Sequence, residues 1–412
     1  MKNTYIQNIS FLLVFFTSVF LINNEIISQI IWTLPNLFVD YLFLITSLKC
    51  NSEGFDIFNS SSFKCMGAVF NHGKILLITP YIEKLDSFYR NVLPYILIFI
   101  FIYQIMRIIK PYNKATYLMF VLSVINPSTL LLMERMNLDI LIFIAIVFIV
   151  YNKYFLINYF ILFYLSLGKF YPVVLFINTF LENKTRSIKK IIILISIVIF
   201  SLALYVALNL DQYIYSLKHL SASKSGYHYL FSLNALPKIF KYMGVNYILS
   251  ILIIYSSFIY GIIKIFKKIN FNYSKYNLDV YSYESKLFLL GGYISFFCFI
   301  IFSNWFYREV FLILTFPLIS NIHHNFKDKF SSLLFNFLIM RYFFLFIYGY
   351  LNINDNINYI NNLRVFSTEF ISIISIKGII DFILMMIIAS MLLFFTNLLL
   401  KDLKYKYKKF YK

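Results

Sequence analysis

The sequence predicts an all-α, polytopic membrane protein. Of its 412 residues, 60% are hydrophobic and only 13% are charged, whereas soluble globular chains are about a quarter charged. Apolar stretches long enough to cross a hydrocarbon core of about 30 Å recur along the whole chain. No run alternates with the period of two that a membrane barrel requires. We therefore interpret residues 1–412 as a single integral membrane unit.

The apolar runs predict about twelve transmembrane helices. We expect them at residues 8–22, 92–110, 115–132, 138–152, 155–168, 170–183, 190–209, 245–265, 286–303, 309–322, 331–350 and 377–400. The first run is interpreted as a retained signal anchor, because no small-residue cleavage site follows residue 22.

Lys and Arg in the short loops predict the topology. Basic clusters occur at 107–114, 184–190, 264–268 and 327–329, and in the C-terminal tail. Such clusters face the cytoplasm in membrane proteins, so we expect both termini inside, most simply in a bacterial plasma membrane. The net charge of +19 is then explained by these loops and by anionic headgroups rather than by a nucleic-acid partner.

Three outward segments are longer than turns require, and loops of that size are usually functional. They are residues 23–91, 210–244 and 351–376. The first would hold an amphipathic stretch at 36–48 that lies along the membrane surface. Residues 92–209 would form a transmembrane core, and residues 245–412 the C-terminal helices and basic tail. A hairpin at 155–183 keeps the C-terminal tail cytoplasmic, which puts its tip at 168–172 on the outer side.

Ionisable and polar side chains from separate connections should meet at this outer face. Ionisable groups at membrane depth are costly and point to function. The candidates are Asp40, His72, Glu134, Arg135, Asn137, Asp139, Lys169, His228 and Arg308.

Each candidate also has a structural interpretation. Glu134 and Arg135 could form an interfacial ion pair, and Asp139 could cap the helix that follows it. Arg308 and Glu309 could be a structural pair. Asp40 could be a surface carboxylate and the histidines solvated loop residues, since their spacing fits no metal site.

The cysteines suggest an outward disulfide. Cys50 and Cys65 share the first outward loop and could pair in an oxidising compartment, whereas Cys298 lies inside a predicted span. No phosphate-binding loop, dinucleotide fingerprint or nucleophile elbow is present in the sequence.

Two segments resemble the GT-C glycosyltransferases of glycosyltransferase family 87. The first is "ERMNLDILIFIAIVFI", in which Met136 replaces the family's usual glycine, and the second is "LGKFYP" at residues 167–172. The stretch "FVDYLFLITSLKCNSEGFDIF" is similar to that family's first outward segment, with Phe58 in place of a tyrosine. The resemblance covers roughly residues 33–183.

This resemblance implies a membrane transferase that takes a sugar, often mannose, from a polyprenyl-phosphate donor. The acceptor would be a lipid-linked or cell-surface glycan on the outer side, and the reaction would be inverting, with no metal or cofactor. The general base carried over by position is Asp40. Lys169, Arg135 and Arg308 would bind the donor phosphate with His72 and His228 behind them, and Glu134, Asn137 and Asp139 would form the active-site floor.

Two other functions remain open from the sequence. An O-antigen-type polymerase also has about twelve spans and large outward loops, but typically depends on outward arginines, which are few here. A carrier or flippase for lipid-linked glycans would need polar residues midway through spans in both halves. Arg341 is the deepest charge in the sequence, and Asp381 lies nearer to a span end.

Overall fold

The computed structural model describes most of the chain as helix. The described residues are 2–24, 37–58, 65, 70, 72–78, 81–169, 171–181, 188–211, 214, 230–273, 278–301, 304–326, 329–351, 357–360, 363–366 and 368–410.

The N-terminal half contains most of the shorter helices. Its α-helices are α1 (Lys2–Asn23), α3 (Val39–Ser52), α5 (Asp86–Asn91), α6 (Leu93–Ile109), α7 (Lys114–Ile125), α8 (Pro127–Arg135), α9 (Asp139–Tyr151), α10 (Phe155–Gly168), α11 (Asn178–Leu181) and α12 (Ile188–Leu208). Its 3₁₀ helices are η1 (Lys74–Ile78), η2 (Glu83–Leu85) and η3 (Tyr171–Ile177).

The C-terminal half contains the longest helices. The helices of this half are α14 (Ala235–Tyr242), α15 (Tyr247–Tyr273), α16 (Tyr283–Ile301), η6 (Phe306–Thr315), α17 (Phe316–Phe326), α18 (Lys329–Leu351) and α19 (Thr368–Phe410), of which α15, α18 and α19 are the longest. Strand β1 (Leu230–Phe231) pairs antiparallel with β2 (Asn304–Trp305), and β3 (Ile357–Ile360) pairs antiparallel with β4 (Leu363–Phe366).

The helical membrane architecture is confirmed, but the twelve crossings are not. Among the described residues, four helices are long and apolar enough to span a membrane: Ile6–Asn23, Tyr247–Asn270, Tyr283–Ile301 and Ile376–Tyr405. The number rises to six if two bent helix pairs, α5 with α6 and α7 with α8, each count as one span. Other predicted spans correspond to shorter apolar helices such as α9 and α10.

Two predicted spans differ most from the structure. Residues 170–183 contain the 3₁₀ helix η3 and the single turn α11, and residues 309–322 are divided between η6 and α17. An apolar run records burial in lipid or protein, and it does not distinguish one continuous helix from a 3₁₀ segment that continues into a short helix.

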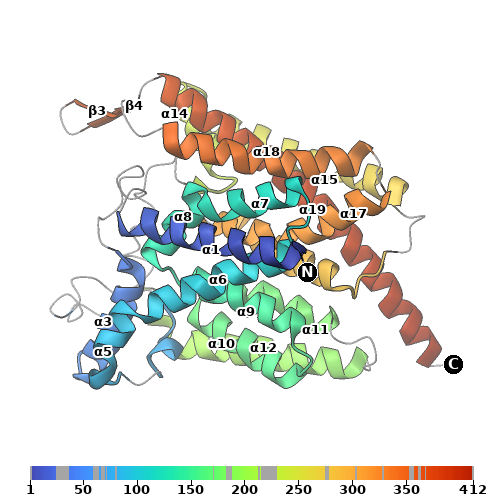
Figure 1. The fold of residues 1–412 in the computed structure, drawn as a ribbon. Helices are drawn as coiled ribbons and strands as arrows, with labels where there is room; N and C mark the ends of the chain where they lie inside the picture. Colours follow the sequence, from blue (N-terminus) through green and yellow to red (C-terminus); the bar gives the residue numbers. More distant parts are fainter. Residues whose placement is uncertain are drawn as a thin grey trace.

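The helices run roughly side by side, with different features at the two ends of the bundle (Figure 1). Both chain ends lie towards the right of this view, whereas α3 and α5 lie at the left-hand end. In this view the chain ends therefore lie away from α3 and α5.

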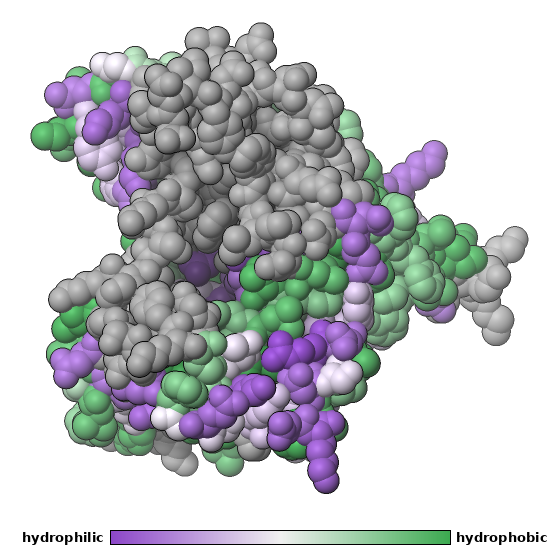
Figure 2. Space-filling view, turned by 90° about the vertical axis from the view of Figure 1, so that its left-hand side faces the viewer, coloured by the Kyte–Doolittle hydropathy of each residue, from purple (hydrophilic) through white to green (hydrophobic). Residues whose placement is uncertain are grey.

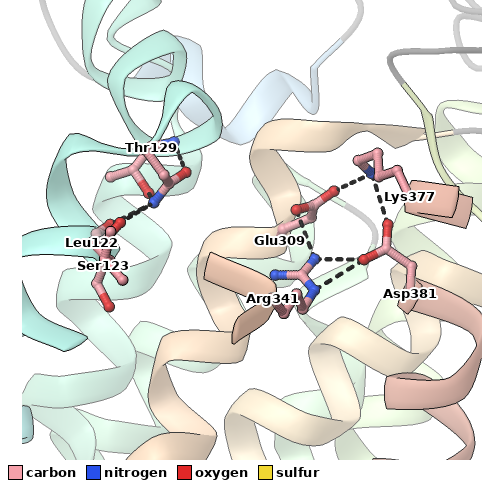
Figure 3. Close-up of polar contacts among 8 residues, drawn as sticks. Leu122, Ser123, Thr129, Glu309, Arg341, Lys377 and Asp381 are labelled. Atoms are coloured by element: carbon pink, nitrogen blue, oxygen red, sulfur yellow. Dashed lines mark hydrogen bonds and ion pairs between the residues drawn. The ribbon is translucent and has the colours of Figure 1, made fainter. Parts of the chain in front are cut away.

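Asn126 forms the joint between α7 and α8, which meet at a bend of 45°. Its side-chain amide donates to the Leu122 and Ser123 carbonyls at 2.8 and 2.9 Å, and its side-chain oxygen accepts from the Thr129 N–H at 3.0 Å (Figure 3). Pro127 follows at the first position of α8, where a missing N–H costs nothing. One side chain thus serves both helix ends and directs α8 towards the candidate site.

Candidate functional site

The start of α3 is held against the end of α8. Phe38 has a left-handed backbone (φ 59°), and its N–H donates to the Glu134 carbonyl at 2.7 Å. Asp40 follows in the first turn of α3. Glu134 therefore positions Asp40 through its backbone, whereas its own side chain is buried in α8.

Met136, the methionine of the "ERMN" element, lies at the end of α8. Met136 has φ 48° and closes the helix, with its N–H donating to the Met133 carbonyl at 3.0 Å. Glycine adopts this left-handed conformation freely, but another L-residue pays roughly 1–2 kcal/mol. Met136 thus occupies a position where glycine would be unstrained, and the turn presents Asn137 next to Asp40.

Asp40 accepts hydrogen bonds from two neighbours. The Arg135 guanidinium donates to it in a bidentate manner at 2.5 and 3.1 Å, and the Asn137 amide donates at 2.6 Å. The Asp40 side chain remains 21% exposed. A carboxylate offers about four acceptor positions, so Asp40 can still accept a proton or a hydrogen bond from the solvent side.

Asp139 lies in a different environment although it is only two residues from Asn137. Its side chain is fully buried and pairs with Lys169, which also donates to the Asn137 side-chain oxygen at 2.8 Å. The Tyr171 hydroxyl donates to the same Asp139 oxygen as Lys169. Burial lowers the pKa of Lys169, while the negative charge of Asp139 opposes that change.

Arg308 completes the cluster from the C-terminal half of the chain. Its Nε lies 3.5 Å from the second Asp139 oxygen, and its guanidinium carbon lies 4.9 Å from the centre of the Tyr171 ring. Among the side chains joined by these ion pairs, three cations (Arg135, Lys169, Arg308) and two carboxylates (Asp40, Asp139) leave one excess positive charge. The cluster thus has the charge balance of an anion-binding site.

Gly73 brings His72 beside this cluster. The Gly73 N–H donates to the Gly168 carbonyl at 3.0 Å, and a Cβ added at Gly73 would lie 1.7 Å from the Leu167 carbonyl oxygen. Burial, together with the positive charges of Lys169 and Arg308, lowers the pKa of His72 to about 3. His72 is therefore neutral at pH 7 and can contribute a hydrogen bond but no positive charge.

An apolar pocket of about 210 Å³ adjoins the cluster. Lys169 forms part of its wall, and the remaining wall is mainly leucine, isoleucine and tyrosine from α3, η1, α9 and α10, including Tyr41, Leu44, Leu76, Leu141 and Leu165. A cationic group at the edge of an apolar cavity suits a ligand that has an anionic head and an apolar chain.

The end of the molecule that carries α3 contains a recess (Figure 2). The residues visible at the bottom of this recess are hydrophilic, whereas green, apolar residues lie beside it. Asp40, Arg135 and Arg308 retain 21%, 19% and 22% of their side-chain exposure, so the cluster is reachable by small polar molecules.

A second polar cluster, which we call the charge ring, is almost completely buried. Arg341 donates to Glu309 at 2.7 Å and to Asp381 at 2.7 and 2.9 Å. Lys377 donates to Glu309 at 2.6 Å and to Asp381 at 2.7 Å, which closes the ring (Figure 3). All four side chains are at most 5% exposed.

The structure brings most of the predicted site residues together. Asp40, Arg135, Asn137, Asp139, Lys169 and Arg308 form one connected set of contacts. His228 lies outside the described residues. The Arg135 side chain donates to Asp40.

One structural interpretation from the sequence is wrong, and another is incomplete. Arg308 and Glu309 are not paired with each other in the way expected, because Arg308 reaches Asp139 while Glu309 joins the charge ring. Asp139 also does more than cap α9: its oxygens face Lys169, Tyr171 and Arg308, and the Asn137 side chain accepts the Asp139 N–H at 3.1 Å.

The cysteines form a separate small core next to the site. Cys50 and Cys65 are bonded, with their Cα atoms 6.1 Å apart. Cys50 packs with Ile57, Phe58 and Phe70. Cys298 is a free cysteine buried in α16. Within the described ranges, no group of three or more His, Cys, Asp or Glu residues could hold a metal ion.

Several residues of the site were not predicted from the sequence. Tyr171, Gly73 and the charge-ring residues Glu309 and Lys377 were not among the candidates. The four-residue spacing of Lys377 and Asp381 was the available signal, because residues at that spacing lie on one face of a helix.

No family model, curated protein or solved structure matches this chain.

Proposed function

We propose that this protein is an integral membrane glycosyltransferase that uses a polyprenyl-phosphate-linked sugar, a hexose such as mannose, as its donor. The acceptor would be a lipid-linked or cell-surface glycan. One observation carries this proposal: a polar cluster with one excess positive charge, drawn from both halves of the chain, adjoins an apolar pocket through the shared residue Lys169.

The proposed reaction is a single displacement. An acceptor hydroxyl oxygen attacks the anomeric carbon of the donor sugar, and the bond from that carbon to the phosphate oxygen breaks. The leaving polyprenyl phosphate keeps the electron pair and gains one negative charge, and the configuration at the anomeric carbon is inverted. Asp40 is the proposed general base that takes the hydroxyl proton, because it is the partly exposed carboxylate of the cluster.

The cations of the cluster suit the departing phosphate. Arg308 and Lys169 already face a carboxylate, Asp139, that is fully buried, so their positions are fixed before any ligand arrives. Preorganised donors of this kind stabilise developing negative charge without reorganisation. Asp139 is the orienting residue in this scheme, because its carboxylate is fully buried.

The test is transfer by the purified full-length protein supplied with polyprenyl-phosphate-mannose and lipid-linked acceptors. The wild type should consume donor and form product. Asp40→Asn should reduce the rate by about 10²–10⁴-fold, which is the usual contribution of a general base. Asp56→Asn is the matched control, because Asp56 is an exposed acid in the same region, beyond the end of α3.

Wild-type turnover by Asp40→Asn would exclude Asp40 as the base. Absence of transfer by the wild type with a panel of polyprenyl-phosphate hexoses would contradict the proposed function itself.

A carrier for lipid-linked glycans is the second candidate, and the charge ring favours it. Buried ionisable residues in both halves of the chain are what such a carrier requires, and Arg341 and Asp381 belong to one network in the C-terminal half. Proteoliposomes separate the two functions: a carrier would move an unchanged lipid-linked glycan across the bilayer, whereas a transferase would convert the donor.

A further inference from the structure

The charge ring joins three elements that are distant in the sequence. Glu309 comes from η6, Arg341 from α18, and Lys377 and Asp381 from α19 (Figure 3). Two acids and two bases balance, so the ring carries no net charge. Burying ion pairs is expensive, and well-packed apolar residues often give equal stability. A contribution to stability is therefore a weak explanation for the ring. A better explanation is that the ring fixes the arrangement of η6, α18 and α19 relative to one another.

The element that most needs fixing is η6. It is a 3₁₀ helix of ten residues, whereas 3₁₀ runs longer than three or four residues are uncommon because their hydrogen-bond geometry is poor. From Val310 to Thr315 its side chains are buried apolar groups and one threonine. Apolar packing is non-directional, so it holds η6 inside the bundle without setting the rotation of its first turn.

Glu309 sets that rotation, and it is the neighbour of Arg308. A 3₁₀ helix has three residues per turn, so adjacent side chains leave the axis about 120° apart. Glu309 points to Arg341 and Lys377, while Arg308 points to Asp139 and the Tyr171 ring. Because adjacent Cα atoms are only about 3.8 Å apart, the ring that anchors Glu309 also anchors the backbone of Arg308.

A second contact fixes the chain just before Arg308. Strand β2 pairs with β1, with Trp305 opposite Leu230 and Asn304 opposite Phe231. The first turn of η6 is thus restrained on one side by backbone pairing and on the other by the charge ring. Arg308 lies between these two restraints.

We propose that Glu309, through the charge ring, is a positioning residue that holds the Arg308 guanidinium against Asp139. If the proposed transferase function is right, on which this part of the inference rests, the ring sets the distance between the Arg308 guanidinium and the phosphate of the donor. The ring itself touches no substrate.

The test uses a variant that keeps the buried charge balanced. Glu309→Leu combined with Lys377→Met removes one acid and one base, and leaves the Arg341–Asp381 pair, which is 2.7 Å apart. Because a misplacement of about 1 Å can cost about 10²-fold in rate, we expect kcat to fall by about that factor while KM changes little. In an Arg308→Ala background, the same double substitution should cause almost no further loss.

The control for lost stability is Leu392→Ala. Leu392 is a buried leucine of α19 that packs against α16 at Gly292, and its truncation should lower the unfolding temperature. It should leave turnover unchanged. Additive losses for the ring and Arg308 variants, or an equal loss of kcat in the leucine variant at matched unfolding temperature, would overturn the positioning role.

A readout that needs no substrate separates this inference from the proposed function. A cysteine placed at 308 (Arg308→Cys) should react faster with a small thiol reagent when the ring is opened by the double substitution. Faster labelling without any sugar transfer by the wild type would support the positioning role and contradict the transferase. Unchanged labelling would overturn the positioning role. If the double variant does not fold, Glu309→Asp, which keeps the charge but shortens the side chain, should give a smaller shift in the same direction.

Discussion

The two aspartates of the candidate site differ in their exposure and in their contacts. Asp40 is 21% exposed and meets Arg135 and Asn137, whereas Asp139 is fully buried among Lys169, Tyr171 and Arg308. The basic loops predicted that both acids lie on one side of the membrane. The sequence could not distinguish their exposure, because exposure depends on Arg308 and Tyr171, which come from other elements.

His72 gives the site a pH dependence that can be measured. Burial lowers its pKa to about 3 in the folded protein, whereas the ordinary value is about 6.5. Between pH 3 and pH 6.5 the His72 side chain binds a proton in the unfolded chain but not in the folded protein. The free energy of unfolding is therefore unaffected by this group above pH 6.5 and decreases as the pH falls below that value. The slope is at most about 1.4 kcal/mol per pH unit.

His72→Gln should therefore flatten the fall in unfolding temperature between pH 7 and pH 5. The measurement is thermal unfolding of the detergent-purified protein across that range. His324→Gln is the control, because His324 is exposed on α17 and its ring contacts Tyr112. If His72→Gln and the wild type lose stability in parallel, His72 does not have the lowered pKa described above.

At the scale of elements, the backbones at Gly73 and Gly168 lie in close contact near the site. A methyl group at Gly73 would meet the Leu167 carbonyl oxygen at 1.7 Å, which no side-chain movement can relieve. A methyl group at Gly168 would meet only the flexible end of Leu76, at 2.9 Å. The backbone of the first loop and the end of α10 thus fit together only without a side chain at position 73.

Gly73→Ala should separate His72 from Lys169 and lower transfer at least tenfold, with a loss of stability of about 1–3 kcal/mol from overpacking. Gly168→Ala should have the weaker effect on both quantities. Donor consumption and unfolding temperature measured on the same preparations test this order. An equal or larger loss in Gly168→Ala would mean that the Gly73 contact is not the critical one.

The sequence predicted elements best where one apolar run forms one helix. The bounds of α6, α9, α10 and α16 agree with the predicted spans to within a few residues. The runs at 170–183 and 309–322 became 3₁₀ helices with short continuations, and α19 begins at Thr368, inside a segment predicted as an outward loop. Apolar periodicity records burial, but where a helix breaks is decided by its packing partners.

At the scale of the whole molecule, the basic loops predict that both chain ends face the cytoplasm. The chain ends lie opposite the α3 end of the bundle in Figure 1. Lys74 is exposed on the α3 side, in η1, and Lys404 is exposed near the end of α19. The candidate site belongs to the side of Lys74, through its neighbour Gly73.

In whole cells, a cysteine at position 74 (Lys74→Cys) should react with an impermeant thiol reagent. One at position 404 (Lys404→Cys) should react only after permeabilisation, as the positive-inside distribution requires. Cys298→Ser provides the background, because Cys298 is the free cysteine and is buried. Labelling of position 404 in intact cells would reverse the predicted topology and place the site in the cytoplasm.

Helix η6 connects the candidate site with the charge ring, and this connection could not be predicted from the sequence. Arg308 and Glu309 are neighbours, but they belong to different polar clusters. The other members of the Arg308 cluster precede it by more than a hundred residues, whereas those of the Glu309 cluster follow it within seventy-two residues. The polar residues themselves were visible in the sequence, and Arg341 stood out as a deep charge. Their partners depend on tertiary packing, which a single sequence does not encode in any local pattern.

Helix α19 has a mechanical consequence. Its 43 residues at 1.5 Å each extend about 65 Å, roughly twice the thickness of the hydrocarbon layer, and it crosses the molecule diagonally in Figure 1. Lys377 and Asp381 lie near its start, and the lysine-rich tail forms its end. We therefore expect a displacement of the C-terminal end of α19 to move Lys377 and Asp381, and with them the charge ring.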